Sequence, residues 1–171
     1  GHALDTNLNA GVDVLRGEAA NVPTTTVSYG SGAVNRSLSG GQISSRINVP
    51  DNFPIQGATA AGRSGLRLRL NLSTNNVAPL TATLVYHPDS PGAHSVTVFS
   101  GLVQGPSGGG FIDTLFDDLA STPISQGAPP FFAGPYAPKS PFLTAPGGPD
   151  LGGFLGLGSG GTWGLGIESS G

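Results

Sequence analysis

The sequence predicts an all-β protein, built as a sandwich or a barrel. From Thr24 onward, short runs rich in Val, Ile, Leu, Thr and aromatic residues are separated by clusters of Gly, Pro, Asn and Ser, which is typical of strands joined by turns. Residues 66–72 alternate leucine with Arg or Asn, so one face of this segment is apolar. No segment has a convincing helical period, and we expect at most one helical turn, within residues 113–121.

The strands are expected in order along the chain. Residues 66–72 and 80–86 are predicted to be antiparallel neighbours, because only a turn-forming segment separates them. Pro88, Pro91 and Gly92 then predict a reversal into the next strand, since proline is excluded from central ladder positions and glycine permits a positive φ. The seven predicted strands are residues 24–29, 43–49, 66–72, 80–86, 94–100, 111–116 and 162–168.

The chain of 171 residues is long enough for one hydrophobic core. Residues 1–22 have few regularly spaced apolar residues, and we interpret them as an expression scar at Gly1 and His2 followed by a linker or leader. Residues 23–171 are then the β-sandwich. Residues 120–161 are rich in proline and glycine, and we expect this long loop to be held by its large apolar residues, which are Phe131, Phe132, Tyr136, Phe142, Leu151 and Phe154.

Composition excludes several kinds of function. Only 10% of the residues are charged and the net charge is −3, so no basic surface is expected to attract nucleic acid. Cysteine is absent, which excludes disulfides and thiol nucleophiles. No run of about 18 apolar residues is present to predict a membrane span.

Four motifs follow one another in the second half of the chain. They are a glycine-led segment ending in Phe-Asp-Asp at 108–118, Gly-Pro-Tyr-Ala-Pro at 134–138, Leu-Gly-Gly-Phe-Leu-Gly at 151–156 and Gly-Thr-Trp at 161–163. This order resembles the P-domain of subtilisin-like proprotein convertases and of related secreted bacterial proteins. The resemblance covers residues 39–168 and implies a jelly-roll β-sandwich of the galactose-binding-like type.

The resemblance also implies a role. Such a domain is a non-catalytic, extracellular accessory module that packs on a neighbouring protease-type domain and stabilises it. Bacterial members commonly bind structural calcium, and here Asp113, Asp117 and Asp118 are the candidate ligands, since calcium prefers oxygen donors. The plainer alternative is that Asp117 or Asp118 accepts backbone N–H groups of the following loop.

The chain departs from the family pattern in three places. Ala78 and Pro79 stand where the family usually has an acidic residue, which removes one potential calcium ligand. The loop between Tyr136 and Leu151 is longer and richer in glycine and proline than usual. The family also continues beyond the position of Gly171 into a further strand, so we expect that strand to be missing or replaced by a segment from the first 40 residues.

Two other functions stay open at this stage. The first is a carbohydrate-binding or adhesive module that uses the loop region and exposed aromatic residues, although we expect Trp163 to be core because its strand neighbours are apolar. The second is a serine hydrolase built on Ser107 with His87 or His94 and an aspartate. Residues 105–109 have the spacing of a nucleophile elbow, but no helix follows them. We interpret His87 and His94 as exposed imidazoles at the ends of a turn, with too few donors nearby for a transition metal.

Overall fold

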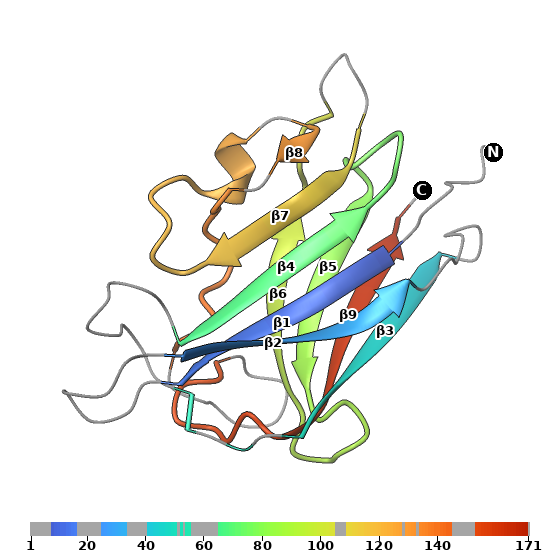
Figure 1. Ribbon diagram of the computed structural model, residues 1–171. Coiled ribbons are helices and arrows are strands. Elements are labelled where there is room, and N and C mark those ends of the chain that lie inside the picture. Colours follow the sequence, from blue (N-terminus) through green and yellow to red (C-terminus); the bar gives the residue numbers. More distant parts are fainter. Residues whose placement is uncertain are drawn as a thin grey trace.

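The computed structural model describes residues 8–16, 25–33, 41–50, 52, 54–55, 65–104, 109–127, 129–132, 134–144 and 153–170. These residues form nine strands and one short 3₁₀ turn (Figure 1), which confirms the all-β prediction. The elements are β1 (Leu8–Arg16), β2 (Thr25–Ala33), β3 (Gln42–Val49), β4 (Leu66–Leu72), β5 (Leu80–Tyr86), β6 (His94–Ser100), β7 (Phe111–Asp117), η1 (Ile124–Gln126), β8 (Phe131–Phe132) and β9 (Gly161–Ser169).

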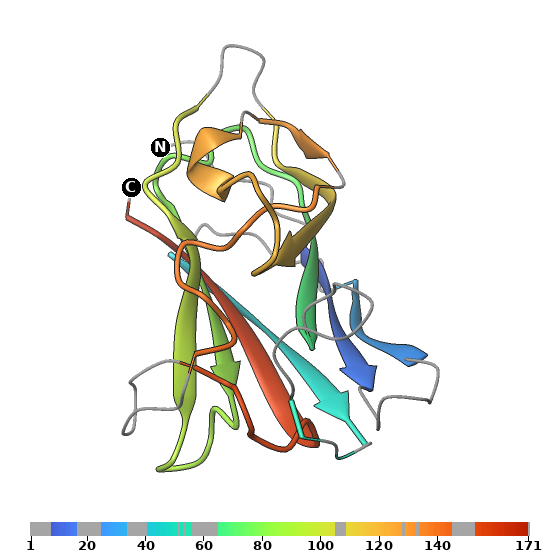
Figure 2. The ribbon, with the colours of Figure 1, turned by 90° about the vertical axis from the view of Figure 1, so that its left-hand side faces the viewer.

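The strands form two sheets that lie face to face (Figure 2). One sheet has the order β2-β1-β4-β7-β8 and the other has the order β3-β9-β5-β6. All the strand pairs are antiparallel except β7 with β8. The arrangement is a β-sandwich whose core lies between the two layers.

Each strand predicted from residue 43 onward agrees with an observed strand to within a residue, and β8 was not predicted. The predicted pairing of residues 66–72 with residues 80–86 is wrong. β4 and β5 are not paired: β4 lies between β1 and β7, and β5 lies between β9 and β6. The connection between them passes from one sheet to the other, so both apolar faces enter the same core. The helical turn is at Ile124–Gln126 rather than within 113–121, where β7 continues to Asp117.

Residues 1–22, which we interpreted as a scar and a linker or leader, include the strand Leu8–Arg16. This segment is β1, which pairs with β4 from Leu8 opposite Leu72 to Val14 opposite Leu66, and with β2 on its other side. A signal was present in the sequence, because Leu8, Ala10, Val12 and Val14 recur at the strand period of two. β2 also runs four residues beyond the predicted strand, to Ala33.

The core is built from the alternation that predicted the strands. In β4 each leucine is buried and each residue between them is half-buried, and β3 and β5 show the same period. Part of the long loop after β7 is held as expected: Phe131, Phe142 and Phe154 are all buried. Tyr136 packs against the core at its margin, whereas Leu151 and the side chain of Phe132 lie outside the described residues.

Trp163 of β9 is fully buried, as the sequence predicts. Its ring contacts Tyr86 and Phe154 edge to face, each with a centroid distance of 5.0 Å. Its indole N–H donates to the carbonyl of Ser159 at 2.9 Å, so the polar atom of the side chain is satisfied inside the core. Through these contacts Trp163 joins β5 to the segment that precedes β9.

We expect Trp163→Ala to lower the free energy of unfolding by about 3–5 kcal/mol, because it removes the largest buried side chain and leaves a cavity. Urea unfolding followed by far-UV circular dichroism measures this change without the tryptophan signal. Val103→Ala is the control, since Val103 is 77% exposed, and it should change stability by less than about 0.5 kcal/mol. Equal losses of unfolding free energy in the two variants would contradict the claim that Trp163 is a central residue of the core.

Candidate functional site

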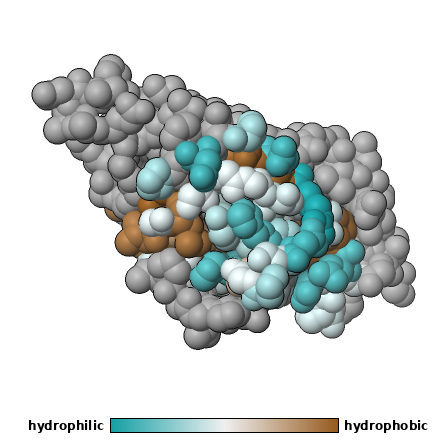
Figure 3. All heavy atoms as spheres, turned by 90° about the horizontal axis from the view of Figure 1, so that it is seen from below, coloured by the Kyte–Doolittle hydropathy of each residue, from teal (hydrophilic) through white to brown (hydrophobic). Residues whose placement is uncertain are grey.

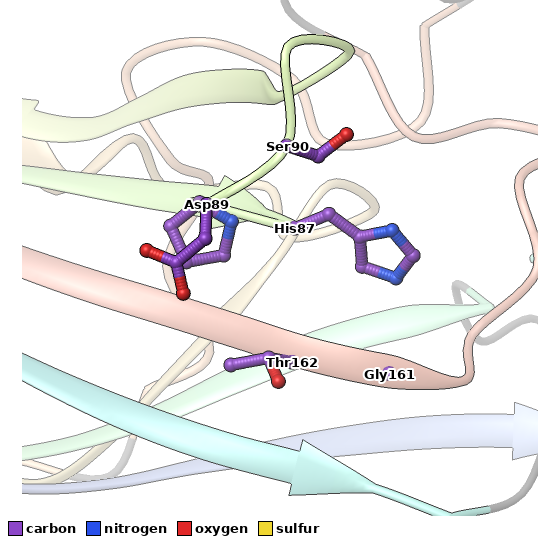
Figure 4. Close-up of a pocket in the computed structure, with 6 residues that line it drawn as sticks. His87, Asp89, Ser90, Gly161 and Thr162 are labelled. Atoms are coloured by element: carbon purple, nitrogen blue, oxygen red, sulfur yellow. The ribbon is translucent and has the colours of Figure 1, made fainter.

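A shallow pocket of about 350 Å³ lies between the turn after β5 and the beginning of β9 (Figure 4). The turn and β9 are brought together because β5 pairs with β9, with Tyr86 opposite Trp163. The end of the molecule that carries this turn shows mostly hydrophilic and near-neutral residues in its middle (Figure 3). The pocket is lined by His87, Pro88, Asp89, Ser90, Gly161 and Thr162.

His87 is fixed from several sides. Its ring stacks on Tyr86 with a centroid distance of 3.8 Å, and its Nε2 lies 2.9 Å from the carbonyl oxygen of Gly160. Its backbone N–H donates to the carbonyl of Thr162, and its own carbonyl accepts from Ser90. The expectation of an exposed imidazole is therefore wrong for His87, which is half-buried.

The backbone at His87 is unusual, since φ is 51°. Positive φ is uncommon for a residue with a Cβ, although histidine adopts it more often than most. Gly161 faces this ring with φ of 107°, and a Cβ there would lie 2.3 Å from His87 Nε2. The close approach of the ring to the β9 backbone thus depends on glycine at 161.

Asp89 and Arg46 form a bidentate ion pair between the turn and β3, in which Arg46 Nη2 donates to Asp89 Oδ1 at 2.8 Å and Nη1 donates to Oδ2. The hydrogen bond from Arg46 lowers the pKa of Asp89, and the pKa of Arg46 is raised in return. Both side chains are largely exposed, so the pair contributes little to stability. Its effect is to orient the Asp89 carboxylate and to neutralise its charge.

The serine-hydrolase alternative gains no support from the described residues. Ser107 lies outside them, so its surroundings are not described. In the pocket, Ser90 Oγ accepts from the backbone N–H of Gly92 at 3.2 Å, and the His87 ring meets a backbone carbonyl through Nε2 rather than a hydroxyl. His94 is half-buried as well, and its Nδ1 has no partner among the described atoms.

The three predicted calcium ligands do not meet at one point. Asp113 follows the beginning of β7, and Asp117 and Asp118 lie at its end, which at about 3.3 Å per residue is more than 10 Å away. The Asp113 carboxylate pairs with Arg69 at 2.9 Å. Among the described residues, no group of three His, Cys, Asp or Glu side chains is placed to hold a metal ion.

Asp117 and Asp118 instead accept backbone N–H groups, as the plainer alternative proposes. Asp117 Oδ1 accepts from Leu119 at 2.8 Å. Asp118 accepts from Phe142 on one oxygen and from Leu143 on the other, both at 2.8 Å. Calcium would have to share or displace these partners. Calcium binding stays a prediction, which thermal melting with calcium and with a chelator tests.

Comparison with family models, with curated proteins and with solved structures gave no match to this chain. Within the described residues, no helix is both long and apolar enough to cross a membrane.

Sequence reasoning did not identify the pocket. It predicted a chain reversal at Pro88, Pro91 and Gly92, but it did not predict that Asp89 of this turn pairs with Arg46, 43 residues earlier. Thr162 and Gly161 were seen only as part of a strand motif. No local signal places these segments together, because the pairing of β5 with β9 decides it.

We expect Gly161→Ala to lower the free energy of unfolding by about 2 kcal/mol or more, since the new methyl group meets His87 and the backbone becomes strained. The matched control is Gly166→Ala on the same strand, where a Cβ meets no atom within 4 Å and the change should be within about 0.5 kcal/mol. Urea unfolding measures both. A neutral Gly161→Ala would show that His87 is not held against β9.

The Asp118 carboxyl gives a prediction about pH. Burial raises its pKa, while the hydrogen bonds from Phe142 and Leu143 partly oppose this rise. A raised pKa in the folded state means that the folded protein binds more protons between the unfolded value of about 3.9 and the folded value. The contribution of Asp118 to stability is therefore fully present below the unfolded pKa and is lost as pH rises through the folded pKa.

We expect Asp118→Asn to remove this pH-dependent step and to cost about 1–3 kcal/mol, because the amide nitrogen faces a backbone N–H donor. Unfolding in urea at several pH values measures both effects. Asp113→Asn is the control, since it exchanges an exposed carboxylate at the same strand and should leave the step in place. The same pH profile in wild type and Asp118→Asn would exclude the assignment.

Proposed function

We propose that this chain is a non-catalytic accessory domain of the P-domain type, with the jelly-roll form of the β-sandwich, in a secreted bacterial protein. Its role is to pack on a neighbouring protease-type domain and to stabilise it. The support is the resemblance of the motifs together with one observation, which is that all four motifs are joined in a single network of contacts.

The first two motifs are joined by backbone hydrogen bonds. The N–H of Asp117, in Phe-Asp-Asp, donates to the carbonyl of Tyr136, and the N–H of Tyr136 donates to Leu115, each at 2.9 Å. The segment with Tyr136 thereby extends the edge of β7, where it also forms a bridge with Phe116. A free strand edge invites unwanted pairing, so the second motif protects the sheet.

The other two motifs are reached through Asp118. Its carboxylate holds the backbone of Phe142 and Leu143, and the carbonyl of Phe142 accepts from the N–H of Phe154 at 2.8 Å. The ring of Phe154 then contacts Trp163 of the last motif. The polar and aromatic groups of the four motifs are therefore engaged in contacts within the domain. Such contacts stabilise a scaffold, and this favours an accessory role over a catalytic one.

A neighbouring domain requires a contact surface. Four large apolar side chains are exposed among the described residues, and they are Val103, Ile112, Leu119 and Leu155. Scattered apolar residues are common on protein surfaces, so these positions serve the proposal as sites for substitution.

The proposal requires a longer protein that contains this chain and a neighbouring protease-type domain. Calorimetry of that longer protein is the test. We expect deletion of residues 1–171 to lower the melting temperature of the neighbouring domain, because a packed interface stabilises both partners. Ile112→Asp should act in the same direction in the longer protein while leaving the melting temperature of this chain alone unchanged. Asn75→Asp is the control substitution, since Asn75 lies exposed on the connection after β4. An unchanged neighbouring domain after the deletion, or peptide hydrolysis by this chain alone, would overturn the proposal.

A further inference from the structure

We infer that the pocket between the turn after β5 and the start of β9 binds a neutral saccharide through the hydroxyl groups of the sugar. The pocket shares Gly161 and Thr162 with the last of the four motifs, but the inference does not depend on the accessory role. It also differs from a carbohydrate site made of loops and exposed aromatic residues, because its polar groups come from the turn and from β9 (Figure 4).

The pocket offers several hydrogen-bond acceptors. Because His87 Nε2 lies against the carbonyl of Gly160, Nε2 carries the hydrogen, and in the neutral ring Nδ1 is then an acceptor. The carboxylate of Asp89 is an acceptor with lone pairs beyond those used by Arg46. A ligand that fits these groups carries several O–H donors.

Two hydroxyl groups complete the set. Ser90 Oγ accepts from Gly92 N–H, so its hydrogen remains to donate, and Thr162 lines the opposite side of the pocket. A hydroxyl both donates and accepts, which matches adjacent hydroxyls of a sugar ring. Pro88 also lines the pocket and contributes apolar surface to it.

The distribution of charge in the pocket disfavours small anionic ligands. Arg46 is the cation nearest to the carboxylate, and both ends of its guanidinium are used by Asp89. An anion such as phosphate would meet hydrogen-bond acceptors, and the nearby guanidinium of Arg46 is already paired with Asp89. Tight recognition of phosphate usually depends on a cationic side chain that is available to it. A neutral polyhydroxy ligand meets neither repulsion nor an unpaired charge.

Contacts within the protein fix the position of the His87 ring in the pocket. His87 is held by the Tyr86 ring, by two backbone hydrogen bonds and by Gly160, in a backbone conformation with positive φ. Strained residues of this kind cluster at binding sites. A preformed site loses less entropy on binding, and a volume of about 350 Å³ is at the small end of ligand pockets, near 300–1,000 Å³.

Titration of ¹⁵N-labelled protein followed by NMR is the test, with the methyl glycosides of glucose, galactose, mannose and N-acetylglucosamine as probes. We expect at least one glycoside to shift the amide signals of Ser90, Gly161 and Thr162, with a dissociation constant on the order of 1 mM, as suits a small ligand in a shallow site. Sodium phosphate at the same ionic strength should leave these signals unchanged.

Substitutions in the pocket test whether the glycoside binds there. Thr162→Val and Ser90→Ala should each weaken binding about fivefold, through the loss of one hydrogen bond, and Thr83→Val on β5 is the matched control that should not change it. The inference is overturned if no glycoside shifts the pocket signals, if phosphate shifts them instead, or if Thr162→Val and Ser90→Ala bind as well as Thr83→Val. None of these outcomes bears on the melting of a neighbouring domain, so the two proposals fail separately.

Discussion

The aromatic contact of Trp163 with its two neighbours is the interaction on which much of this structure depends. The rings of Phe154 and Tyr86 each contact the indole edge to face, at a centroid distance of 5.0 Å. The first contact fixes the long segment that returns to β9, and the second continues through the stacked ring of His87 to the surface. One buried side chain thus links the core, the long loop and the pocket. In a closely packed interior, the position of each ring restricts the positions of the rings that it contacts.

Hydrogen bonds from side chains to the backbone perform a second task in this chain. A segment as rich in proline and glycine as 120–161 cannot satisfy its backbone by regular pairing alone, since proline has no N–H to donate. Asp118 supplies two acceptors to this segment, and Thr114 donates to the carbonyl of Phe131 at 2.6 Å. At the end of β7, the polar side chains that could bind a ligand are bonded to the backbone of the protein instead. The pocket beside His87 differs because it has polar groups that line an open space.

The sequence shows the order of the motifs along the chain, but it does not show which contacts their side chains make in the folded protein. The Phe-Asp-Asp motif drew attention as a source of calcium ligands, and the structure shows two of its carboxylates accepting N–H groups instead. Trp163 was correctly predicted as core from its apolar neighbours. The pocket was missed because its residues have no shared motif, and Arg46 and Asp89 are joined only through strands that are distant in sequence.

The alternation of apolar residues determined the class of the fold and the bounds of most strands, because side chains on a strand point to opposite faces with a period of two. The same alternation says nothing about which strand lies beside which. The tertiary structure decided that β4 and β5 belong to different sheets, that β1 fills the place beside β4, and that β9 lies under the turn with His87. Strand pairing between distant segments depends on how both apolar faces close over one core, and that is a property of the whole chain rather than of any local pattern.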